Sequence, residues 1–480
     1  MCEALAVPAD RVGSDSFDHS FDAVRAEFAL SAAFAPDVLG EAQRAAALRP
    51  GPGPDRVDAT DVDLVTVDPP GSKDLDQALG VRRRGDGFRV HHAIADLGAV
   101  VAPGGALDAE VRRRGQTIYL PDGSVPLHPP VLSEGAASLL PDGPRAAVLW
   151  TIDLDATGEP VTVDVRRAVV RSRARLDYAG VQADVEAGRP HPALAALPEL
   201  GPLRRALAVR RGAIELELPE QEVVPTGEGG WTVRVRRRLD VEAWNAEISL
   251  LTGMAAARIM LDAGVGLLRT LPAPEPDAVA DLRRAAHALG IGWPDGATPA
   301  EVLAGLAPDT APALALRRAA TALLRGAGYA WFDRSVDTGP PADPGHGGIG
   351  APYAHVTAPL RRLVDRFGTE VCLAVTAGAD VPAWLREALP TLSVAMETSD
   401  TLAGKVDRAC VDRTEAALLA GRVGEEFDVV VLRPGAEAGE VYLPDPPVLA
   451  RCTGRLVAGA SVRVRLTEAD PRTGRIAFAA

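Results

Sequence analysis

The stretch DPPGSKDLDQAL, residues 68–79, places three aspartates within nine positions and follows the last of them with a glutamine. Asp68, Asp74 and Asp76 could form a solvated acidic turn, or they could form a cage for a divalent cation. Three carboxylates held close together repel one another and need a cation between them. Oxygen ligands with open coordination positions suit Mg²⁺ or Mn²⁺, which then bind phosphate oxygens. The spacing alone leaves both interpretations open, and Gln77 follows Asp76 without adding a negative charge.

The elements on either side of this stretch are predicted to bring the aspartates together. DVDLVTVD, residues 61–68, alternates as a strand, and the two prolines after it force the chain into a loop because they cannot donate to a ladder. DQALGVRRR, residues 76–84, and GFRVHHAIAD, residues 87–96, are predicted as the next strands, with GDG as the turn. Asp74 and Asp76 point to the same side of an extended chain, and the loop can fold them back toward Asp68.

Composition describes the surface in general terms. The 480 residues carry a formal net charge of −14, with 47% hydrophobic and 24% charged residues. This balance is typical of a soluble globular protein and argues against a surface that coats nucleic acid as a whole, although it is compatible with a basic groove inside an acidic shell. The simplest interpretation of each arginine cluster is a charged surface exposed to solvent. These clusters lie at 82–84, 112–114, 167–176, 234–238 and 358–362.

The sequence also suggests a location in the cell. Its apolar runs are too short to span a bilayer, and its N-terminus, MCEALAVPADRVGSD, lacks the basic and apolar regions of a secretory signal. The four cysteines are scattered without CxxC spacing, which is typical of reduced thiols: they are Cys2, Cys372, Cys410 and Cys452. We therefore expect a cytoplasmic protein without a membrane segment.

The rest of the chain predicts an α+β fold in three parts. Helices are predicted at 21–34, 36–48, 241–264, 277–289, 311–327, from near Pro359, and over about 395–422, and strands near 146–154 and 161–170. The segment 49–56 is a Pro/Gly-rich linker, and 335–350 is a Gly/Pro-rich loop. Short alternating strands fill the C-terminal segment and suit a small β-barrel of the oligonucleotide-binding class. The predicted parts are a helical region 1–55, a central domain 56–423 with a mixed sheet and surrounding helices, and a barrel 424–480.

Several ordered motifs resemble the ribonuclease II / ribonuclease R (RNB) superfamily of 3′→5′ exoribonucleases, in particular its compact actinobacterial members. The motifs are TVDPPGSKDLDQAL, FRVHHAIAD, RRRGQTIYLPDGSVPLHPPVLSEGAASLL, WNAEISLLTGMAAARIM, RGAGYAWF and YAHVTAPLRRLVDRF. They follow the order of that family over about residues 56–423, and the family also leads us to expect an S1-type RNA-binding barrel at the C-terminus. Together they are much more specific than one acidic loop.

The resemblance implies a metal-dependent site. Asp68, Asp74 and Asp76 match the first three of the four aspartates that hold Mg²⁺ in that family, with Mn²⁺ as a substitute. Asp76 matches the aspartate whose loss is most damaging, and Asp74 and Arg361 are the other predicted catalytic residues. Gln77 occupies the fourth position, where it either serves as a variant ligand or strongly reduces catalysis.

The resemblance also implies residues that contact RNA. Tyr119 matches a tyrosine that stacks on a terminal base, and Arg361 matches an arginine at the cleaved phosphate. The remaining candidates for RNA contact are Arg362, Tyr353, Thr357 and Asp412. The aromatic residue that should oppose the tyrosine is absent, because Ile214 to Leu218 are aliphatic or acidic. His355 is interpreted as pocket lining, and His91 and His92 as strand residues that do not bind a metal.

We therefore expect a Mg²⁺-dependent 3′→5′ exonuclease that degrades single-stranded RNA to nucleoside 5′-monophosphates. The expected protein is a monomer without an obligate protein partner. The alternative is an RNA-binding protein that keeps this fold but has weak or lost catalysis because of Gln77. A third idea, a metal-dependent phosphatase, predicts activity on simple phosphomonoesters.

Overall fold

The computed structural model describes residues 20–48, 51–216, 220–226, 230–236, 238–307 and 310–480. The N-terminal stretch 1–15 and Cys2 lie outside the described residues. Cys372, Cys410 and Cys452 are buried and free. In the part of the chain that is described, every helix is too short or too polar to cross a membrane.

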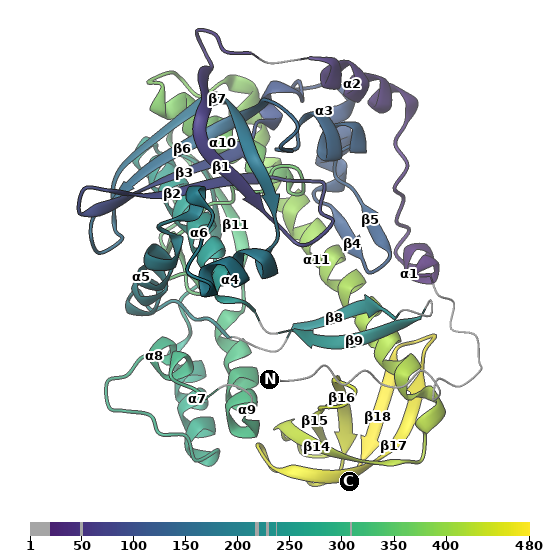
Figure 1. The fold of residues 1–480 in the computed structure, drawn as a ribbon. Helices are drawn as coiled ribbons and strands as arrows, with labels where there is room; N and C mark the ends of the chain where they lie inside the picture. Colours follow the sequence, from purple (N-terminus) through teal and green to yellow (C-terminus); the bar gives the residue numbers. More distant parts are fainter. Residues whose placement is uncertain (1–19, 49–50, 217–219, 227–229, 237, 308–309) are drawn as a thin grey trace.

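A five-stranded closed barrel forms the centre of the upper part in Figure 1. The first and last strands pair in parallel, and the other neighbours pair antiparallel, so the predicted mixed sheet is confirmed. Closure of that sheet into a barrel was not predicted, because it requires pairing between strands about 110 residues apart in sequence, such as Val57 and Ala168. In order around the barrel, the strands are β1 (Val57–Val67), β2 (Gln77–Arg84), β3 (Gly87–Ala95), β6 (Arg145–Leu154) and β7 (Pro160–Leu176).

Helices surround this barrel and share one large apolar core with it. The core includes Trp150 from the barrel together with Ile248, Phe367 and Leu389 from three of the helices. Figure 1 shows α11 running from the barrel to the lower part of the molecule. These helices are α3 (Ala106–Arg114), α4 (Tyr178–Glu186), α5 (Leu197–Arg210), α6 (Asp240–Ala263), α10 (Leu363–Thr376) and α11 (Ala383–Leu419). Three further helices, α7 (Pro276–Ala288), α8 (Pro299–Ala304) and α9 (Ala311–Ala320), pack in a separate apolar cluster.

The C-terminal segment forms a second closed five-stranded barrel, as its alternating strands predict. Alternate residues point inward and build a separate core around Phe427, Val431, Leu466 and Phe478. The strands are β14 (Glu426–Arg433), β15 (Ala438–Leu443), β16 (Val448–Thr453), β17 (Ser461–Asp470) and β18 (Arg475–Ala479).

Short elements complete the fold. Two helices, α1 (Asp22–Glu27) and α2 (Pro36–Ala47), precede the first barrel. Four two-stranded sheets lie outside the barrels in the described residues, and the sequence patterns did not predict them as strand pairs. They are β4 (Ile118–Leu120) with β5 (Gly123–Val125), β8 (Glu220–Pro225) with β9 (Trp231–Arg236), β10 (Val265–Thr270) with β11 (Gly328–Asp333), and β12 (Gly345–His346) with β13 (Ala351–Pro352).

The helix predicted from near Pro359 begins later than expected. Residues 359–361 form a turn, and α10 begins at Leu363. The backbone N–H of Leu360 donates to the Asp76 carboxylate, and the N–H of Leu363 donates to the Gly115 carbonyl. In a helix that began at Pro359, the Leu363 N–H would bond within the helix, so its bond to Gly115 and the extended backbone of Arg362 place the start of α10 at Leu363. The predictions for 395–422 and 21–34 also had wrong bounds, since α11 begins at Ala383 and α1 has six residues.

A buried ion pair fixes the start of α10 against α3. Asp108 and Arg366 side chains are each only 3% exposed, and Arg366 Nη1 donates to Asp108 Oδ1 at 2.7 Å. The second Asp108 oxygen accepts hydrogen bonds from Arg112 Nε and from the Gly104 backbone. Removing one partner would leave the other charge buried and uncompensated.

We therefore expect Asp108→Ala to lower the free energy of unfolding by about 3–5 kcal/mol, the usual cost of breaking a buried ion pair. Urea unfolding followed by circular dichroism measures this loss. Asp262→Ala is the matched control, because it breaks the exposed Arg258–Asp262 pair and should leave the unfolding midpoint nearly unchanged. Equal midpoints for the two variants would contradict this role of Asp108.

Candidate active site

The loop that carries the three aspartates leaves the first barrel after β1 and returns to it at β2. At its start, the Asp68 N–H donates to the carbonyl of Leu176 at the end of β7, over 3.1 Å. Farther along, the Ser138 hydroxyl accepts from the Leu75 N–H and donates to the Lys73 carbonyl. These bonds hold the loop at one end of the barrel, so the positions of its carboxylates are set by the strands below.

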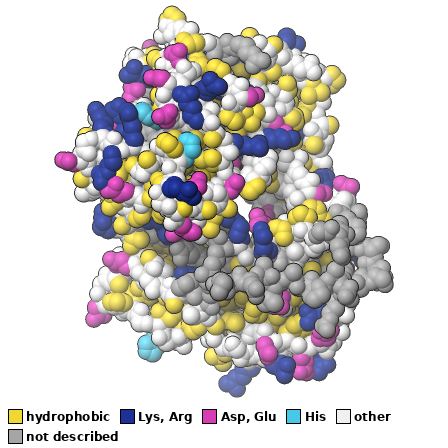
Figure 2. All heavy atoms as spheres, in the orientation of Figure 1, with side chains coloured by type: hydrophobic (Ala, Val, Ile, Leu, Met, Phe, Trp, Pro, Cys, Tyr) yellow, Lys and Arg dark blue, Asp and Glu magenta, His cyan; other side chains and the backbone are white. Residues whose placement is uncertain are grey.

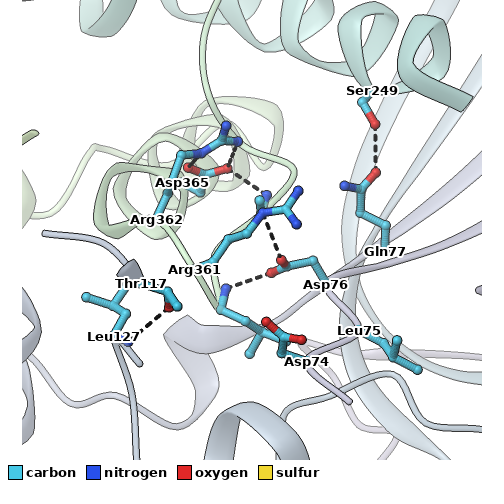
Figure 3. A network of polar contacts seen from close by, with 12 residues as sticks. Asp74, Leu75, Asp76, Gln77, Thr117, Leu127, Ser249, Arg361, Arg362 and Asp365 are labelled. Carbon is cyan, nitrogen blue, oxygen red and sulfur yellow. Dashed lines mark hydrogen bonds and ion pairs between the residues drawn. The ribbon is translucent and has the colours of Figure 1, made fainter. Parts of the chain in front are cut away.

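Asp76 is the most buried of the three aspartates, with 3% of its surface exposed. Its Oδ1 accepts the Leu360 N–H at 2.7 Å, and its Oδ2 lies 3.7 Å from Arg361 Nε (Figure 3). This buried Oδ2 has no hydrogen-bond partner within the described part of the chain. Burial raises the pKa of Asp76 to about 7, although the Arg361 charge acts in the opposite direction. The unpartnered oxygen is therefore a position for a cation.

Asp68 and Asp74 lie on the same loop but are less buried. Burial raises the pKa of Asp68 to about 6, and Asp74 Oδ2 accepts the Tyr119 hydroxyl at 2.9 Å. Among the described residues, no group of three or more His, Cys, Asp or Glu side chains is gathered closely enough to hold a metal ion. Mg²⁺ commonly binds through one or two carboxylates together with waters and substrate phosphates. The residues present fit such a partly hydrated ion, rather than a closed protein cage.

Gln77 is the first residue of β2, and its amide oxygen is occupied by protein groups. Oε1 accepts the Ser249 hydroxyl at 2.7 Å and lies 2.9 Å from His92 Nε2. Figure 3 shows the side chain extending toward Ser249 of α6. His92 in turn contacts Thr252 of α6 through Nδ1, and burial lowers the pKa of His92 to about 3. In this structure Gln77 joins the barrel to α6, and its role as a metal ligand stays a prediction.

The turn before α10 separates the two neighbouring arginines. Arg362 makes two hydrogen bonds to Asp365, at 2.8 and 2.7 Å, and the same carboxylate accepts the Ala358 N–H. Arg361 is 43% exposed, and its one ion pair within the described residues is the 3.7 Å approach of Nε to Asp76 Oδ2. The turn therefore presents Arg361 beside the Asp76 carboxylate, whereas Arg362 stabilises the turn itself.

Tyr119 lies on β4, outside the aspartate loop, and its side chain contacts that loop. The tyrosine is 51% exposed, and its hydroxyl contacts Asp74. At the base of the hairpin, the Thr117 N–H donates to the Arg361 carbonyl at 3.0 Å. Asp74, Asp76, Tyr119 and Arg361, which are far apart in sequence, are thus brought together at one end of the barrel.

Two other residues that were predicted to contact RNA are buried. Tyr353 and Thr357 are 6% and 3% exposed, so they lie beneath the turn that carries Arg361. His355 Nδ1 is 2.8 Å from the Tyr329 hydroxyl, and burial lowers the pKa of His355 well below its usual value. Its interpretation as pocket lining stays a prediction. A role of Tyr353 or Thr357 in RNA binding stays a prediction, and it would require a contact that their burial does not favour.

Asp412 is also distant from the Asp76 carboxylate. It lies on α11 beside Arg408 and against the β17–β18 turn at Gly474. Ser399 of the same helix packs against Gly115, which bonds to the start of α10. At about 1.5 Å per residue, α11 rises by about 20 Å between Ser399 and Asp412. The structure therefore does not bring Asp412 together with the aspartate loop.

The segment without the expected aromatic residue packs in the interior. Ile214 is buried in an apolar cluster with α7, α8 and α9, and Leu216 packs against it. Glu215 forms ion pairs with Arg205 and Arg238. Leu218 lies outside the described residues.

Sequence reasoning missed three groups at this site. The Leu360 backbone N–H and the Ser249 hydroxyl bind Asp76 and Gln77, but neither belongs to a side-chain pattern that marks a site. Tyr178, at the start of α4, lies near enough to Asp68 for that carboxylate to contribute to its raised pKa, after the larger effect of burial. The sequence gives no signal for Tyr178, because the contact depends on the parallel pairing of β1 and β7.

Comparisons with known proteins agree with this arrangement. Residues 56–368 match the family described as RNB domain, and residues 425–480 match the RNase II-type exonuclease C-terminal S1 domain. Ribonuclease R of Escherichia coli (strain K12) is 32% identical over 327 residues, which cover 65% of this chain and 39% of the relative. Exosome complex exonuclease RRP44 of Homo sapiens is 30% identical over 339 residues, which cover 68% of this chain and 35% of the relative.

A solved structure of Mycoplasma genitalium RNase R in complex with ribose-methylated single-stranded RNA has a similar fold. The TM-score is 0.85 at 20% sequence identity, and the match covers 96% of this chain and 77% of that chain. The chain spans less than two fifths of the length of the two curated relatives. The matched domain covers well over half of the sequence and includes the aspartate loop and both arginines of the turn. The chain therefore belongs to the RNB family and ends in an S1 domain of the RNase II type.

Proposed function

We propose that this chain is a divalent-metal-dependent 3′→5′ exoribonuclease that hydrolyses single-stranded RNA to nucleoside 5′-monophosphates. The observation that carries the proposal is the buried Asp76 carboxylate, whose unpartnered Oδ2 lies beside Arg361. Tyr119, an exposed aromatic ring, lies at the neighbouring carboxylate. A cation position, a guanidinium and a stacking surface are the groups that cleavage of a terminal phosphodiester requires.

Asp76, Asp68 and Asp74 would hold the cation, with Mg²⁺ as the proposed ion and Mn²⁺ as a substitute. When bound, such an ion lowers the pKa of a water and neutralises charge on phosphate oxygens. The Leu360 N–H fixes Asp76 Oδ1, which leaves Oδ2 directed to the cation position. Tyr119 restrains Asp74 through its hydroxyl.

Arg361 is the proposed partner of the reacting phosphate. Its guanidinium is partly exposed and is not held by a close bidentate pair, so it can bind a phosphate through two N–H groups. Negative charge builds up on the phosphate oxygens in the transition state, and a fixed guanidinium stabilises it without transferring a proton. The exposed face of Tyr119 would stack on the terminal base, and stacking tolerates any base sequence.

The charge distribution argues against RNA binding over the whole surface. Figure 2 shows basic side chains interspersed with acidic ones over the visible face. The C-terminal barrel adds a second candidate surface for RNA, as the RNase II-type S1 domain suggests. We further propose a cytoplasmic monomer without an obligate protein partner, with domain boundaries at residues 55/56 and 423/424.

An RNA-binding protein without turnover is the second candidate. Gln77 favours this alternative, because it contributes no charge at the site and its amide oxygen contacts Ser249 and His92. Such a protein would bind single-stranded RNA and release no mononucleotide. The two candidates are separated by metal-dependent product release.

Asp76→Asn should lower kcat for mononucleotide release from 3′-labelled RNA by a factor on the order of 100–1000, the range seen when one electrostatic stabiliser is removed from an active site. Product is measured by gel electrophoresis with and without Mg²⁺. Asp164→Asn, which changes an exposed β7 carboxylate, is the matched control and should keep wild-type kcat. If the wild-type chain releases no mononucleotide with Mg²⁺ or Mn²⁺, the exonuclease proposal is wrong.

Gln77→Asp should lower stability by about 1–3 kcal/mol without raising kcat, because the shorter side chain leaves Ser249 and His92 without their shared acceptor. Ser249→Ala is the matched control, since it removes one of these bonds without adding charge. Chemical unfolding and steady-state kinetics measure the two effects. A higher kcat in Gln77→Asp would show instead that the glutamine limits catalysis.

Replacements of Tyr119 should separate its ring from its hydroxyl. Tyr119→Ala removes the ring and should raise KM for RNA by roughly fivefold or more, as expected for one lost base–aromatic stack. Tyr119→Phe keeps the ring and loses only the bond to Asp74, so its KM should stay within about twofold of wild type. Initial rates on a single-stranded oligoribonucleotide give both values. Equal KM values in the two variants would exclude stacking as the role of Tyr119.

A further inference from the structure

The hairpin that carries Tyr119 is too small to be rigid by itself. β4 and β5 have three residues each and are joined through Pro121 and Asp122. An isolated two-stranded hairpin is at best marginally stable in water. Its base is fixed by the Thr117 N–H, which donates to the Arg361 carbonyl. The tip needs a separate support if the Tyr119 ring is to keep one position.

The two faces of β4 have different surroundings. Side chains alternate along a strand, so Ile118 and Leu120 point to the face opposite Tyr119. Ile118 and Leu120 are 4% and 7% exposed. They belong to an apolar cluster with Val24 of α1 and with Phe21, the residue before α1. Phe21 also packs edge-to-face on Trp231 of β9, with ring centroids 5.3 Å apart. Phe21 and Val24, together with α11, therefore cover the back of β4, whose front presents Tyr119.

A charged contact joins α1 to the tip of the hairpin. Arg25 Nη1 donates to Asp122 Oδ2 at 2.8 Å, and Arg25 Nη2 donates to Asp122 Oδ1 at 2.6 Å. The Phe21 N–H, at the start of α1, donates to the same Asp122 Oδ2 at 3.0 Å. The Arg25 and Asp122 side chains are only 25% and 19% exposed. A bidentate, partly buried pair of this kind fixes the relative orientation of the elements that it joins.

The other end of α1 is also anchored. Glu27 forms an ion pair with Arg413 of α11, and Val24 packs in the same cluster as Val406 and Cys410 of that long helix. Figure 1 shows α1 beside β4 and β5, next to α11. The six-residue helix thus connects α11 to the hairpin tip.

We propose that α1, through Arg25 and Asp122, is a positioning element that holds Tyr119 against the aspartate loop and at the terminal base of the RNA. The part of this inference that concerns RNA rests on the proposed function. The hairpin is held at its base by the Arg361 turn and at its tip by α1. The N-terminal region thereby contributes to substrate binding without contacting the RNA itself. Arg25 and Asp122 act only through Tyr119.

The test compares Arg25→Ala and Asp122→Ala in the full chain with Glu27→Gln as the matched control. Glu27→Gln removes one ion pair in which Glu27 is half exposed, so it should cost little, and it leaves both the packing of Val24 on α11 and the hairpin contact intact. Each variant is measured for kcat and KM on single-stranded RNA, and by hydrogen exchange of the amides in residues 116–127. The double variant Arg25→Asp with Asp122→Arg rebuilds the ion pair with reversed charges.

We expect both alanine variants to raise KM by roughly fivefold, the scale of one base stack, while kcat changes by less than about twofold. Hydrogen exchange in the hairpin should become faster in both, and the charge-reversed pair should return KM to within about twofold of wild type. Glu27→Gln should match wild type. Unchanged hairpin exchange in both alanine variants would overturn the inference, and so would an equal rise of KM in Glu27→Gln. If the wild type has no ribonuclease activity, only the proposed function fails, and hydrogen exchange still decides whether α1 holds the hairpin.

Discussion

The arrangement of this site depends on one costly group, the buried Asp76 carboxylate. Burial of a carboxylate oxygen without a hydrogen-bond partner strongly disfavours the ionised form of the carboxyl group. Within the described residues, Asp76 Oδ2 is such an oxygen. Burial raises the pKa of Asp76 to about 7. The Arg361 guanidinium, 3.7 Å away, and the Leu360 N–H offset this effect only in part. A cation would stabilise the ionised form, which supports the proposal that a cation binds at Asp76 Oδ2.

The bonds around Asp76 also determine where the other groups lie. The Leu360 N–H donates to the Asp76 carboxylate, and the Arg361 carbonyl accepts the Thr117 N–H. The Leu363 N–H donates to the Gly115 carbonyl. With these tertiary bonds, α10 begins later in the chain than expected, and the segment before it forms a turn. The same turn presents Arg361 and anchors the base of the Tyr119 hairpin. The position of the guanidinium and the position of the aromatic ring are therefore consequences of one set of backbone hydrogen bonds.

Local patterns in the sequence were sufficient for the strands of both barrels, for α2, α6, α7 and α9, and for the loop that carries Asp76, whereas α3, α4, α5 and α8 were not predicted. They could not predict the closure of the first barrel, since the parallel pairing of β1 with β7 joins distant segments. They also could not show that Gln77 turns to Ser249, that Asp412 lies far along α11, or that α1 supports the Tyr119 hairpin. Each of these depends on which surface a side chain meets after folding, and residue type and spacing do not encode that surface.

Arginine pairing distinguishes Arg361 from most other arginines of the sequence clusters. Most arginines in the sequence clusters are neutralised locally: Arg113 and Arg114 bind Glu110, and Arg83 binds Glu199. Arg362 is held by two short bonds to Asp365, whereas its neighbour Arg361 has one long approach to Asp76. A cation at Asp76 would weaken even that approach, because it competes for the same carboxylate. If a cation binds there as proposed, metal binding and phosphate binding would be coupled, since Arg361 would be freed from Asp76.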